Sequence, residues 1–239
     1  MTEPLFREDP YLKSCDATVL SADVDGICVD RTVFYAMGGG QPGDTGKIVR
    51  ANGDTIRITD TRKATDSSAI LHVPAEPEPL PVAGESVQMT IDWERRHRFM
   101  RMHSCMHLLC VVIPAPVTGG SIRDGSGRLD FDLPEPPDKE KITAQLNALI
   151  AQNRPRRLRW ITDEEMAQQP ELVRTMSVQP PSGAGRVRLV EFEGIDLQPC
   201  GGTHVASTGE IGRVRVAKIE KKGKHNRRVI VEFVENEAL

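Results

Sequence analysis

The chain reads FMRMHSCMHLL over residues 99–109, and this stretch, together with a second one much later in the sequence, decides how the chain is organised. Within it, His103 and His107 have the spacing that places two side chains on the same face of a helix. The second stretch reads CGGTH over residues 200–204, and its glycines let the backbone between Cys200 and His204 fold tightly. Each pair can therefore direct two side chains toward one point.

The residue types of the two pairs suit a metal ion. Three imidazole nitrogens and one thiolate form a tetrahedral ligand set that fits zinc better than calcium or magnesium. Either pair alone is weak evidence, because a histidine on an apolar helix face is usually a core side chain bonded to a carbonyl. Together, with glycines inside the second pair, they favour one zinc ion bound by His103, His107, Cys200 and His204.

Length and composition place the chain among ordinary globular proteins. Its 239 residues suffice for one large or two modest domains, and 27% of them are charged. No apolar run is long enough to cross a membrane, and the first ten residues lack the basic and apolar regions of a signal peptide. Five cysteines without a regular spacing argue against a disulfide framework and for a reducing compartment, so we expect a cytoplasmic protein.

The first part of the chain favours short strands. Segments with β-branched or alternating residues are separated by Gly, Asp and Asn, a pattern that predicts a small barrel or sandwich. The predicted strands cover residues 17–20, 26–30, 47–50, 55–58 and 86–91. The prolines between residues 74 and 81 are interpreted as a surface loop within this domain, because residues 84–92 still read as a strand.

The pattern then changes to a mixture of helices and strands. A helical stripe runs from Phe99 to Ile113, with Asp92 as a plausible N-cap and Pro114 as a stop, so the domain boundary is placed near residue 92. The predicted domains are therefore residues 1–92 and 93–239. The second is expected to contain a hairpin at 121–131, a helix at 138–153, a strand at 187–192 and a closing hairpin formed by 211–220 and 227–234. We assign an α+β fold with an antiparallel sheet.

A glycine-rich segment, FYAMGGGQPGDTG at residues 34–46, stands between two predicted strands. It is neither a P-loop nor a dinucleotide-binding loop, because no helix follows it and no Gly-Lys-Ser/Thr is present. Its composition favours a tight turn between strands. The alternative is a close approach of backbone to a ligand or to another chain, which consecutive glycines allow.

Positive charge is concentrated although the net charge is -3. Residues 213–228 contain eight Lys or Arg against one acid, Glu220, and two further clusters lie at 95–101 and 154–159. Each cluster alone reads as solvated surface. Three clusters in a slightly acidic protein favour a local positive face that follows a phosphate backbone.

These segments together match a known family. The glycine-rich segment, the two histidines of residues 103–107, and residues 190–205 occur in the family's order, and residues 208–212 and 222–228 extend the match. The chain resembles the stand-alone alanyl-tRNA editing proteins of the AlaX group and the editing region of alanyl-tRNA synthetase. It is similar to the medium-length class of that group. No segment reads as an ATP-dependent aminoacylation domain, so we do not expect the chain to charge tRNA.

The resemblance implies a fold, a cofactor and a reaction. It implies a β-barrel of the translation-factor type in residues 1–92, followed by an α+β editing domain with zinc held at His103, His107, Cys200 and His204. The implied reaction is hydrolysis of the ester that joins serine or glycine to tRNA(Ala). The implied partner is the acceptor end of that tRNA. Met37 stands where the family pattern leads us to expect an acidic or polar residue.

Further site residues follow from the requirements of that reaction. Thr118 and Ser121 are candidates to bind the serine hydroxyl, because a polar group left unpaired by alanine discriminates between the two esters. By resemblance, Gly39, Gly40 and Gln41 are placed near the 3′ end of the tRNA. The expected phosphate contacts are Lys222, Lys224, Arg227 and Arg228.

Two other functions remain open from the sequence. One is a non-catalytic, zinc-stabilised RNA-binding module, in which the metal only ties the helix to the Cys200 turn. The other is a metal-dependent hydrolase of small esters or amides. Zinc with four protein ligands resembles a closed structural site, so a catalytic role requires a ligand to leave or the coordination to expand.

Overall fold

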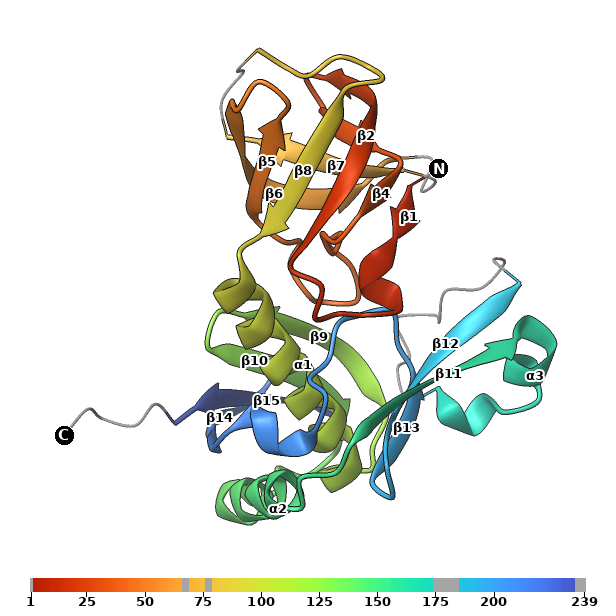
Figure 1. Ribbon diagram of the computed structural model, residues 1–239. Helices are drawn as coiled ribbons and strands as arrows, with labels where there is room; N and C mark the ends of the chain where they lie inside the picture. Colours follow the sequence, from red (N-terminus) through yellow and green to blue (C-terminus); the bar gives the residue numbers. More distant parts are fainter. Residues whose placement is uncertain (1, 66–68, 76–78, 174–184, 235–239) are drawn as a thin grey trace. The chain divides into compact units, whose positions relative to one another are not determined.

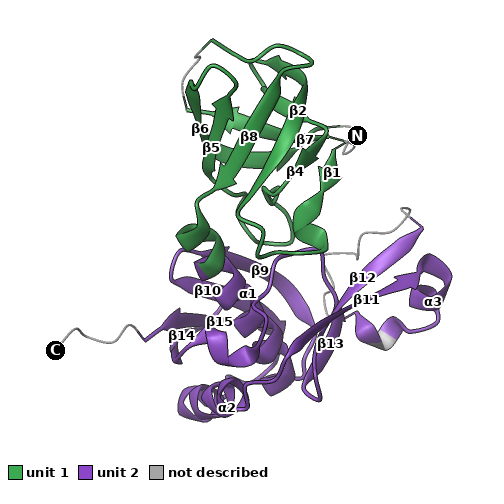
Figure 2. Ribbon diagram, viewed as in Figure 1, with its two compact units in different colours: residues 1–97 green, residues 98–239 purple. Residues whose placement is uncertain are grey.

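The computed structural model describes residues 2–65, 69–75, 79–173 and 185–234. It divides into two compact units, residues 1–97 and residues 98–239 (Figures 1 and 2). The division falls between His97 and Arg98, inside the first α-helix. None of the helices within the described ranges is long and apolar enough to cross a membrane.

The first unit is built around a closed antiparallel barrel, as the sequence predicted. Its strands follow the order β2-β3-β7-β6-β5-β8 around the barrel. Their bounds are Ser14–Asp23 (β2), Gly26–Val29 (β3), Gly46–Arg50 (β5), Thr55–Lys63 (β6), Ile70–Pro74 (β7) and Ser86–Ile91 (β8). A short parallel pair, β1 (Glu3–Pro4) with β4 (Arg31–Thr32), and a 3₁₀ turn at Leu5–Arg7 complete the unit.

Alternation along the strands produces the barrel interior. In β8, for example, Val87, Met89 and Ile91 are buried, and the residues between them are more exposed. Inward side chains such as Ile48, Ile58 and Met89 form one core cluster with neighbours from the other strands. Because side chains on a strand alternate between faces, one residue in two is enough to fill the interior.

The glycine-rich segment connects β4 to β5 and contains a tight turn. The backbone groups of Gly38 and Gln41 exchange hydrogen bonds at 3.1 and 3.0 Å, and the two residues between them, Gly39 and Gly40, have φ of 56° and 81°. Positive φ at both central positions is the signature of a type I′ turn, which glycine adopts at little cost. The expected turn between strands is therefore present.

A buried ion pair fastens this segment inside the first unit. Arg96, fully buried in the first turns of α1 (Trp93–Val112), holds the carboxylate of Asp44 with Nε and Nη2. Its remaining donors bond the carbonyls of Pro10 and Val33 at 3.0 and 2.6 Å. Asp44 also accepts from the backbone N–H of Tyr35 at 2.7 Å. This arginine, read from the sequence as part of a positive surface, is instead a core residue.

Helix α1 begins where the sequence predicted and is buried on nearly all sides. Asp92 is its N-cap, with Oδ1 accepting from the backbone N–H of Arg95 at 3.3 Å. The sequence suggested a single apolar stripe, but Met100, Met102, Cys105 and Leu108 are fully buried as well. A helix that is enclosed all round lies in the interior of its domain rather than on the surface.

The second unit contains a four-stranded antiparallel sheet of order β14-β15-β10-β9. The strands are β9 (Val117–Arg123), β10 (Ser126–Asp132), β14 (Val214–Lys221) and β15 (Asn226–Phe233), so both predicted hairpins pair in one sheet. Gly127 of β10 allows α1 to approach closely, since a Cβ there would lie 2.8 Å from Sδ of Met102 and 3.0 Å from Sδ of Met106. The glycine thus brings the helix onto the sheet.

Helix α2 (Lys139–Ala151) packs beside β14. Asp138 caps it by accepting from the backbone N–H of Lys141, and Ile142, Leu146 and Ile150 are its buried residues. Asn147 bonds both the carbonyl and the N–H of Val214, at 2.8 and 3.1 Å. Those bonds satisfy backbone groups at the sheet edge that would otherwise lack partners.

A second, three-stranded antiparallel sheet supports the later half of the site. Its order is β11-β12-β13, with bounds Arg156–Thr162, Arg186–Phe192 and Asp196–Pro199. The short helix α3 (Asp163–Ala167) and the 3₁₀ turn Pro170–Leu172 lie against this sheet, and the 3₁₀ turn Thr208–Ile211 lies against α2. Of the three strands, only β12 was predicted.

Candidate metal centre

The two histidines of α1 lie on one face of the helix, as their spacing requires. The ring centroids of His103 and His107 are 5.5 Å apart, and both residues are buried. Because neighbouring turns of α1 pack against the sheet, the two imidazoles are held in the interior of the second unit and face away from solvent.

The second pair follows directly after β13. Cys200 comes after the strand ends at Pro199, and the N–H of Gly202 points to its Sγ at 3.4 Å. After His204, the backbone N–H of Val205 donates to Oγ of Ser104 on α1 at 3.1 Å. This bond ties the end of the turn to the helix between its two histidines.

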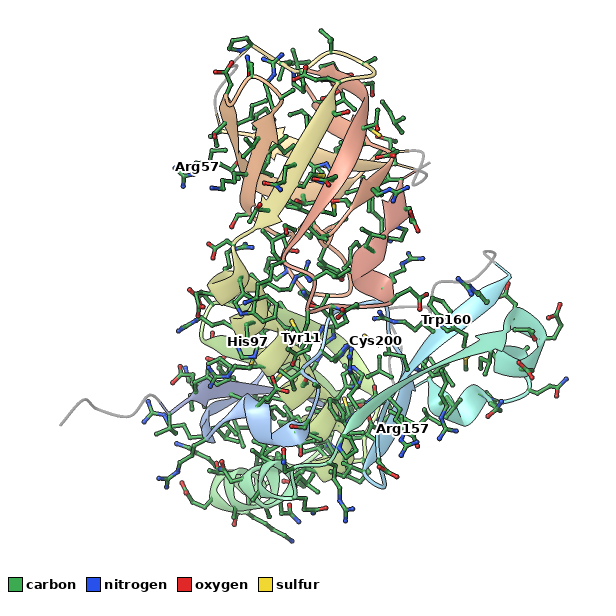
Figure 3. The ribbon with its side chains drawn as sticks, in the orientation of Figure 1. Tyr11, Arg57, His97, Arg157, Trp160 and Cys200 are labelled. Atoms are coloured by element: carbon green, nitrogen blue, oxygen red, sulfur yellow. The ribbon has the colours of Figure 1, made fainter. Side chains whose placement is uncertain are left out.

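The four side chains converge on one point; Figure 3 labels one of them, Cys200. One potential ligand atom from each of His103, His107, Cys200 and His204 lies within 4.8 Å of the other three. Nε2 of His204 is 3.1 Å from Nε2 of His107, and Sγ of Cys200 is 3.5 Å from Nε2 of His103.

These separations test whether a zinc ion fits. Tetrahedral zinc–nitrogen and zinc–sulfur bond lengths imply about 3.4 Å between two nitrogen ligands and about 3.6 Å between nitrogen and sulfur. The two observed distances are close to those values. The donor set and its spacing therefore fit a tetrahedral ion, and the cluster could hold a metal.

The surroundings of Cys200 and His204 favour the protonation states that metal ligands need. Burial alone raises the pKa of the Cys200 thiol, but the facing imidazoles of His103 and His204 outweigh it and hold that pKa well below its usual range. Burial, together with the electrostatic effect of the nearby His103, holds the pKa of His204 well below its usual range. These shifts favour a thiolate at Cys200 and a neutral imidazole at His204, which are the ligating forms.

His107 is oriented by two residues that sequence reasoning did not assign to the site. Its Nδ1 lies 3.2 Å from Oδ2 of Asp196, and Nε2 of Gln198 donates to the same oxygen at 2.7 Å. Burial lowers the pKa of His107, but the hydrogen bonds with Asp196 and Cys200 outweigh it and raise that pKa to about 9. A carboxylate behind a ligand histidine fixes which ring nitrogen faces the metal.

The candidates for reading the serine hydroxyl lie on β9. Thr118 Oγ1 donates to the carbonyl of Asp130 at 3.2 Å and accepts from Nδ2 of Asn226 at 3.1 Å. Ser121 is half-buried and pairs across the sheet with Arg128. The structure thus places both residues on the sheet of the unit that contains the metal cluster.

The glycine-rich candidates belong to the first unit. Gly39 and Gly40 are exposed at the tip of the type I′ turn, whereas Gln41 is fully buried. Met37, just before the glycines, is 55% exposed, so a polar residue would be tolerated there.

The four predicted tRNA contacts divide into two kinds. Lys222 and Lys224 are exposed, and Lys222 pairs with Glu220 at 2.8 Å. Arg228 instead forms a bidentate pair with Asp130 at 2.8 and 2.9 Å. Arg227 is buried and donates to backbone carbonyls, including that of Pro134. Arg227 therefore holds the hairpin turn, Arg228 ties β15 to β10, and the two lysines are the more accessible cations.

Comparison with known sequences identifies the family. Residues 187–230 match the family described as threonyl and alanyl tRNA synthetase second additional domain, and residues 10–95 match class II (A) tRNA synthetases. The alanyl-tRNA editing protein AlaX-M of Methanosarcina barkeri is 38% identical over 98% of this chain and 100% of its own length. AlaX-M of Saccharolobus solfataricus is 33% identical over 96% of this chain and 98% of its own.

The likeness extends to a larger enzyme. The alanine–tRNA ligase of Sulfurisphaera tokodaii is 34% identical over 92% of this chain, a match that takes up 25% of the ligase. The resemblance inferred from the CGGTH and glycine-rich motifs is thereby confirmed. The chain belongs to the family of alanyl-tRNA editing proteins of the AlaX-M type.

Proposed function

We propose that the protein is a trans-editing hydrolase that removes serine or glycine from mischarged tRNA(Ala), with a zinc ion bound by His103, His107, Cys200 and His204. One observation carries the proposal. These four donor atoms lie within 4.8 Å of one another in a chain that aligns almost from end to end with proteins named for alanyl-tRNA editing.

Physical chemistry explains why such an activity is needed. A synthetase pocket built for alanine rejects glycine weakly, since one missing methyl group is worth only about 1–3 kcal/mol. It also rejects serine weakly, because serine adds only a hydroxyl. A separate site that hydrolyses the wrong esters restores fidelity after charging.

The residues of this chain hold and orient the metal. Cys200 contributes a thiolate and His204 a neutral imidazole, while Asp196 orients the ring of His107. When bound, zinc supplies a Lewis acid that polarises an ester carbonyl or lowers the pKa of a water molecule. Burial of the cluster strengthens each of these electrostatic interactions because water is excluded.

Discrimination against alanine is assigned to Thr118, with Ser121 as the second candidate. The hydroxyl hydrogen of Thr118 is directed to the Asp130 carbonyl, and one of its lone pairs accepts from Asn226. A threonine oxygen has a second lone pair, which can accept from the serine hydroxyl. An alanyl ester offers no such donor, so only the seryl ester gains this bond.

The tRNA is proposed to meet the tip of the β14–β15 hairpin. Lys222 and Lys224 supply the phosphate contacts there, whereas Arg227 holds the hairpin turn and Arg228 ties β15 to β10. In the first unit, the exposed backbone of Gly39 and Gly40 allows a close approach of the tRNA 3′ end, supported by buried Gln41. We place this activity in the cytoplasm, where Cys200 stays reduced.

A deacylation assay tests the proposal. Purified protein is incubated with Ser-tRNA(Ala), Gly-tRNA(Ala) and Ala-tRNA(Ala), and release of each amino acid is followed. We expect the seryl or glycyl ester to be hydrolysed at least about 100-fold faster than the alanyl ester. Equal rates on all three esters, or none, contradict editing.

The metal requirement is tested with a matched pair of cysteine variants. Cys200→Ala is expected to remove bound zinc and deacylation together, whereas Cys15→Ala, at a half-buried cysteine of the first unit, should retain both. Full activity in metal-free protein contradicts the role of zinc.

The non-catalytic RNA-binding module is kept as the second candidate because four protein ligands form a closed set. In that case tRNA binds with zinc present but no ester is cleaved. Cleavage of small esters without any preference for tRNA identifies the general hydrolase instead.

A further inference from the structure

We infer that Arg188 is a positioning residue that holds the Cys200–His204 turn in its metal-binding shape before the metal arrives. This inference rests on the metal site of the proposed function. Arg188 lies in β12, on the strand next to β13, and only 6% of it is exposed. Its guanidinium bonds backbone carbonyls of the turn, so it acts on the backbone that carries two of the four donor atoms.

The guanidinium of Arg188 bonds two carbonyls inside the turn. Nε donates to the carbonyl of Cys200 at 2.9 Å, and Nη2 donates to the carbonyl of Gly202. In return, the backbone N–H of Cys200 donates to the carbonyl of Arg188 at 3.1 Å. The peptide groups on both sides of Cys200 are therefore fixed, and with them the direction of its Cα–Cβ bond.

The turn needs such a restraint because of its composition. Gly201 and Gly202 lose more conformational freedom on ordering than any other residue type would. The pairing of β12 with β13 ends at Leu189 and Pro199, and after the backbone bond between Cys200 and Arg188 the ladder no longer restrains the chain. Without an external donor, the carbonyls of Cys200 and Gly202 would stay unsatisfied in a largely buried place.

Arginine suits this role better than lysine. Its planar fork offers several donors in fixed directions, so two carbonyls can be held at once and little freedom is lost for each bond. Lysine has three donors on one rotating nitrogen at the end of a flexible stem, so it lacks the fixed geometry that holds two separate carbonyls in place. Arg188→Lys therefore keeps the positive charge and removes the two-point restraint.

Three measurements on Arg188→Lys test the inference, with Arg186→Lys as the matched control. Arg186 lies on the same strand, is exposed, and stacks on Trp160 at 4.3 Å. Zinc affinity, measured by competition with a chromophoric chelator, should fall about 10- to 100-fold in Arg188→Lys and stay unchanged in Arg186→Lys. The absorption bands of the cobalt-substituted protein should shift in Arg188→Lys alone, because the ligand geometry changes.

The third measurement separates a positioning role from a merely structural one. In metal-free wild-type protein, the amide hydrogens of Gly201, Gly202 and Thr203 should exchange slowly, and in Arg188→Lys they should exchange faster. Unprotected amides in the metal-free wild type overturn the inference, even if the variant does not fold. A variant with lower thermal stability but unchanged zinc affinity and cobalt spectrum also overturns it.

The outcomes for the inference and for the proposed function are distinct. If wild-type protein binds zinc and both variants bind it equally well, the role of Arg188 fails and the metal site stands. If wild-type protein takes up no zinc, the metal site itself fails, whatever the variants do.

Discussion

The carboxylate of Asp196 lies 3.2 Å from Nδ1 of His107, and it is held there by Gln198, which donates to the same oxygen at 2.7 Å. Because this contact sets the orientation of a ligand imidazole, Asp196→Asn should lower zinc affinity about 10- to 100-fold. The affinity is measured by chelator competition. Glu193→Gln, at a half-buried position paired with Arg157, serves as the control and should bind zinc normally. Equal affinity in the two variants contradicts the orienting role.

Gly43 should tolerate no side chain. A Cβ there would lie 2.0 Å from the carbonyl oxygen of Thr61, which is backbone and cannot rotate away. We expect Gly43→Ala to lower the free energy of unfolding of the first unit by about 1–3 kcal/mol or more. Urea unfolding followed by Trp93 fluorescence, in a Trp160→Phe background, reports on that unit. Gly38→Ala is the control, since its Cβ would meet the nearest atom at 3.6 Å. If Gly38→Ala lowered the free energy of unfolding as much as Gly43→Ala, the steric argument would be contradicted.

The lysines at the hairpin tip should account for part of the salt dependence of tRNA binding. Each phosphate contact that is lost reduces the slope of log K against log salt concentration by about 0.7–0.9. Lys222→Ala with Lys224→Ala is thus expected to flatten the slope and weaken binding. The control is Lys47→Ala, at an exposed lysine of the first unit. An unchanged slope in the double variant moves the tRNA-binding face elsewhere.

Acid should destabilise the first unit through His72. This residue is fully buried, with Nδ1 donating to the carbonyl of Ile27 and Nε2 facing the hydroxyl of Thr32. Burial lowers its pKa from 6.5 to about 4, only partly offset by the bond to Ile27. A folded-state pKa below the unfolded value means that the stabilisation is complete above pH 6.5 and is lost as the pH falls toward 4.

The size of this effect follows from the shift in pKa. Such a shift corresponds to about 3 kcal/mol lost between neutral pH and pH 4. Over the same pH range, the free energy of unfolding of His72→Gln should fall by that much less than the free energy of unfolding of the wild-type protein. Both are measured by urea unfolding at each pH, with Trp93 as the probe. Parallel pH profiles for the two proteins would contradict this account.

Alternation and turn residues were sufficient to predict the larger sheet and most of the barrel. Strand β7 was missed because Ile70–Pro74 is short and adjoins a proline run. Strand β11 was missed because its arginines read as a positive cluster. Arg159, however, pairs with Glu191 of the neighbouring β12, and Arg157 (labelled in Figure 3) pairs with Glu193 just after that strand. Those charges are matched across strands, which only the register reveals.

The four candidate metal ligands could be predicted from the spacing of residues in the sequence. The residues that orient those ligands could not. His103 and His107 follow from helix geometry, and Cys200 and His204 from a short turn, so both pairs are local features. Asp196 and Arg188 act through the pairing of β12 with β13 and the position of α1, which are long-range features. An acidic residue on the strand that leads into CGGTH was the available signal for Asp196.

The position of the division inside α1 bears on how the protein could be shortened. A fragment that starts at Arg98 would lack the Asp92 cap, and the first free N–H groups of the truncated helix would fray close to His103. A fragment that starts at Asp92 would keep the cap but leave Arg96 without Asp44. A usable excision of the second unit therefore begins at or before Asp92 and leaves Arg96 in water or replaces it with a neutral polar side chain.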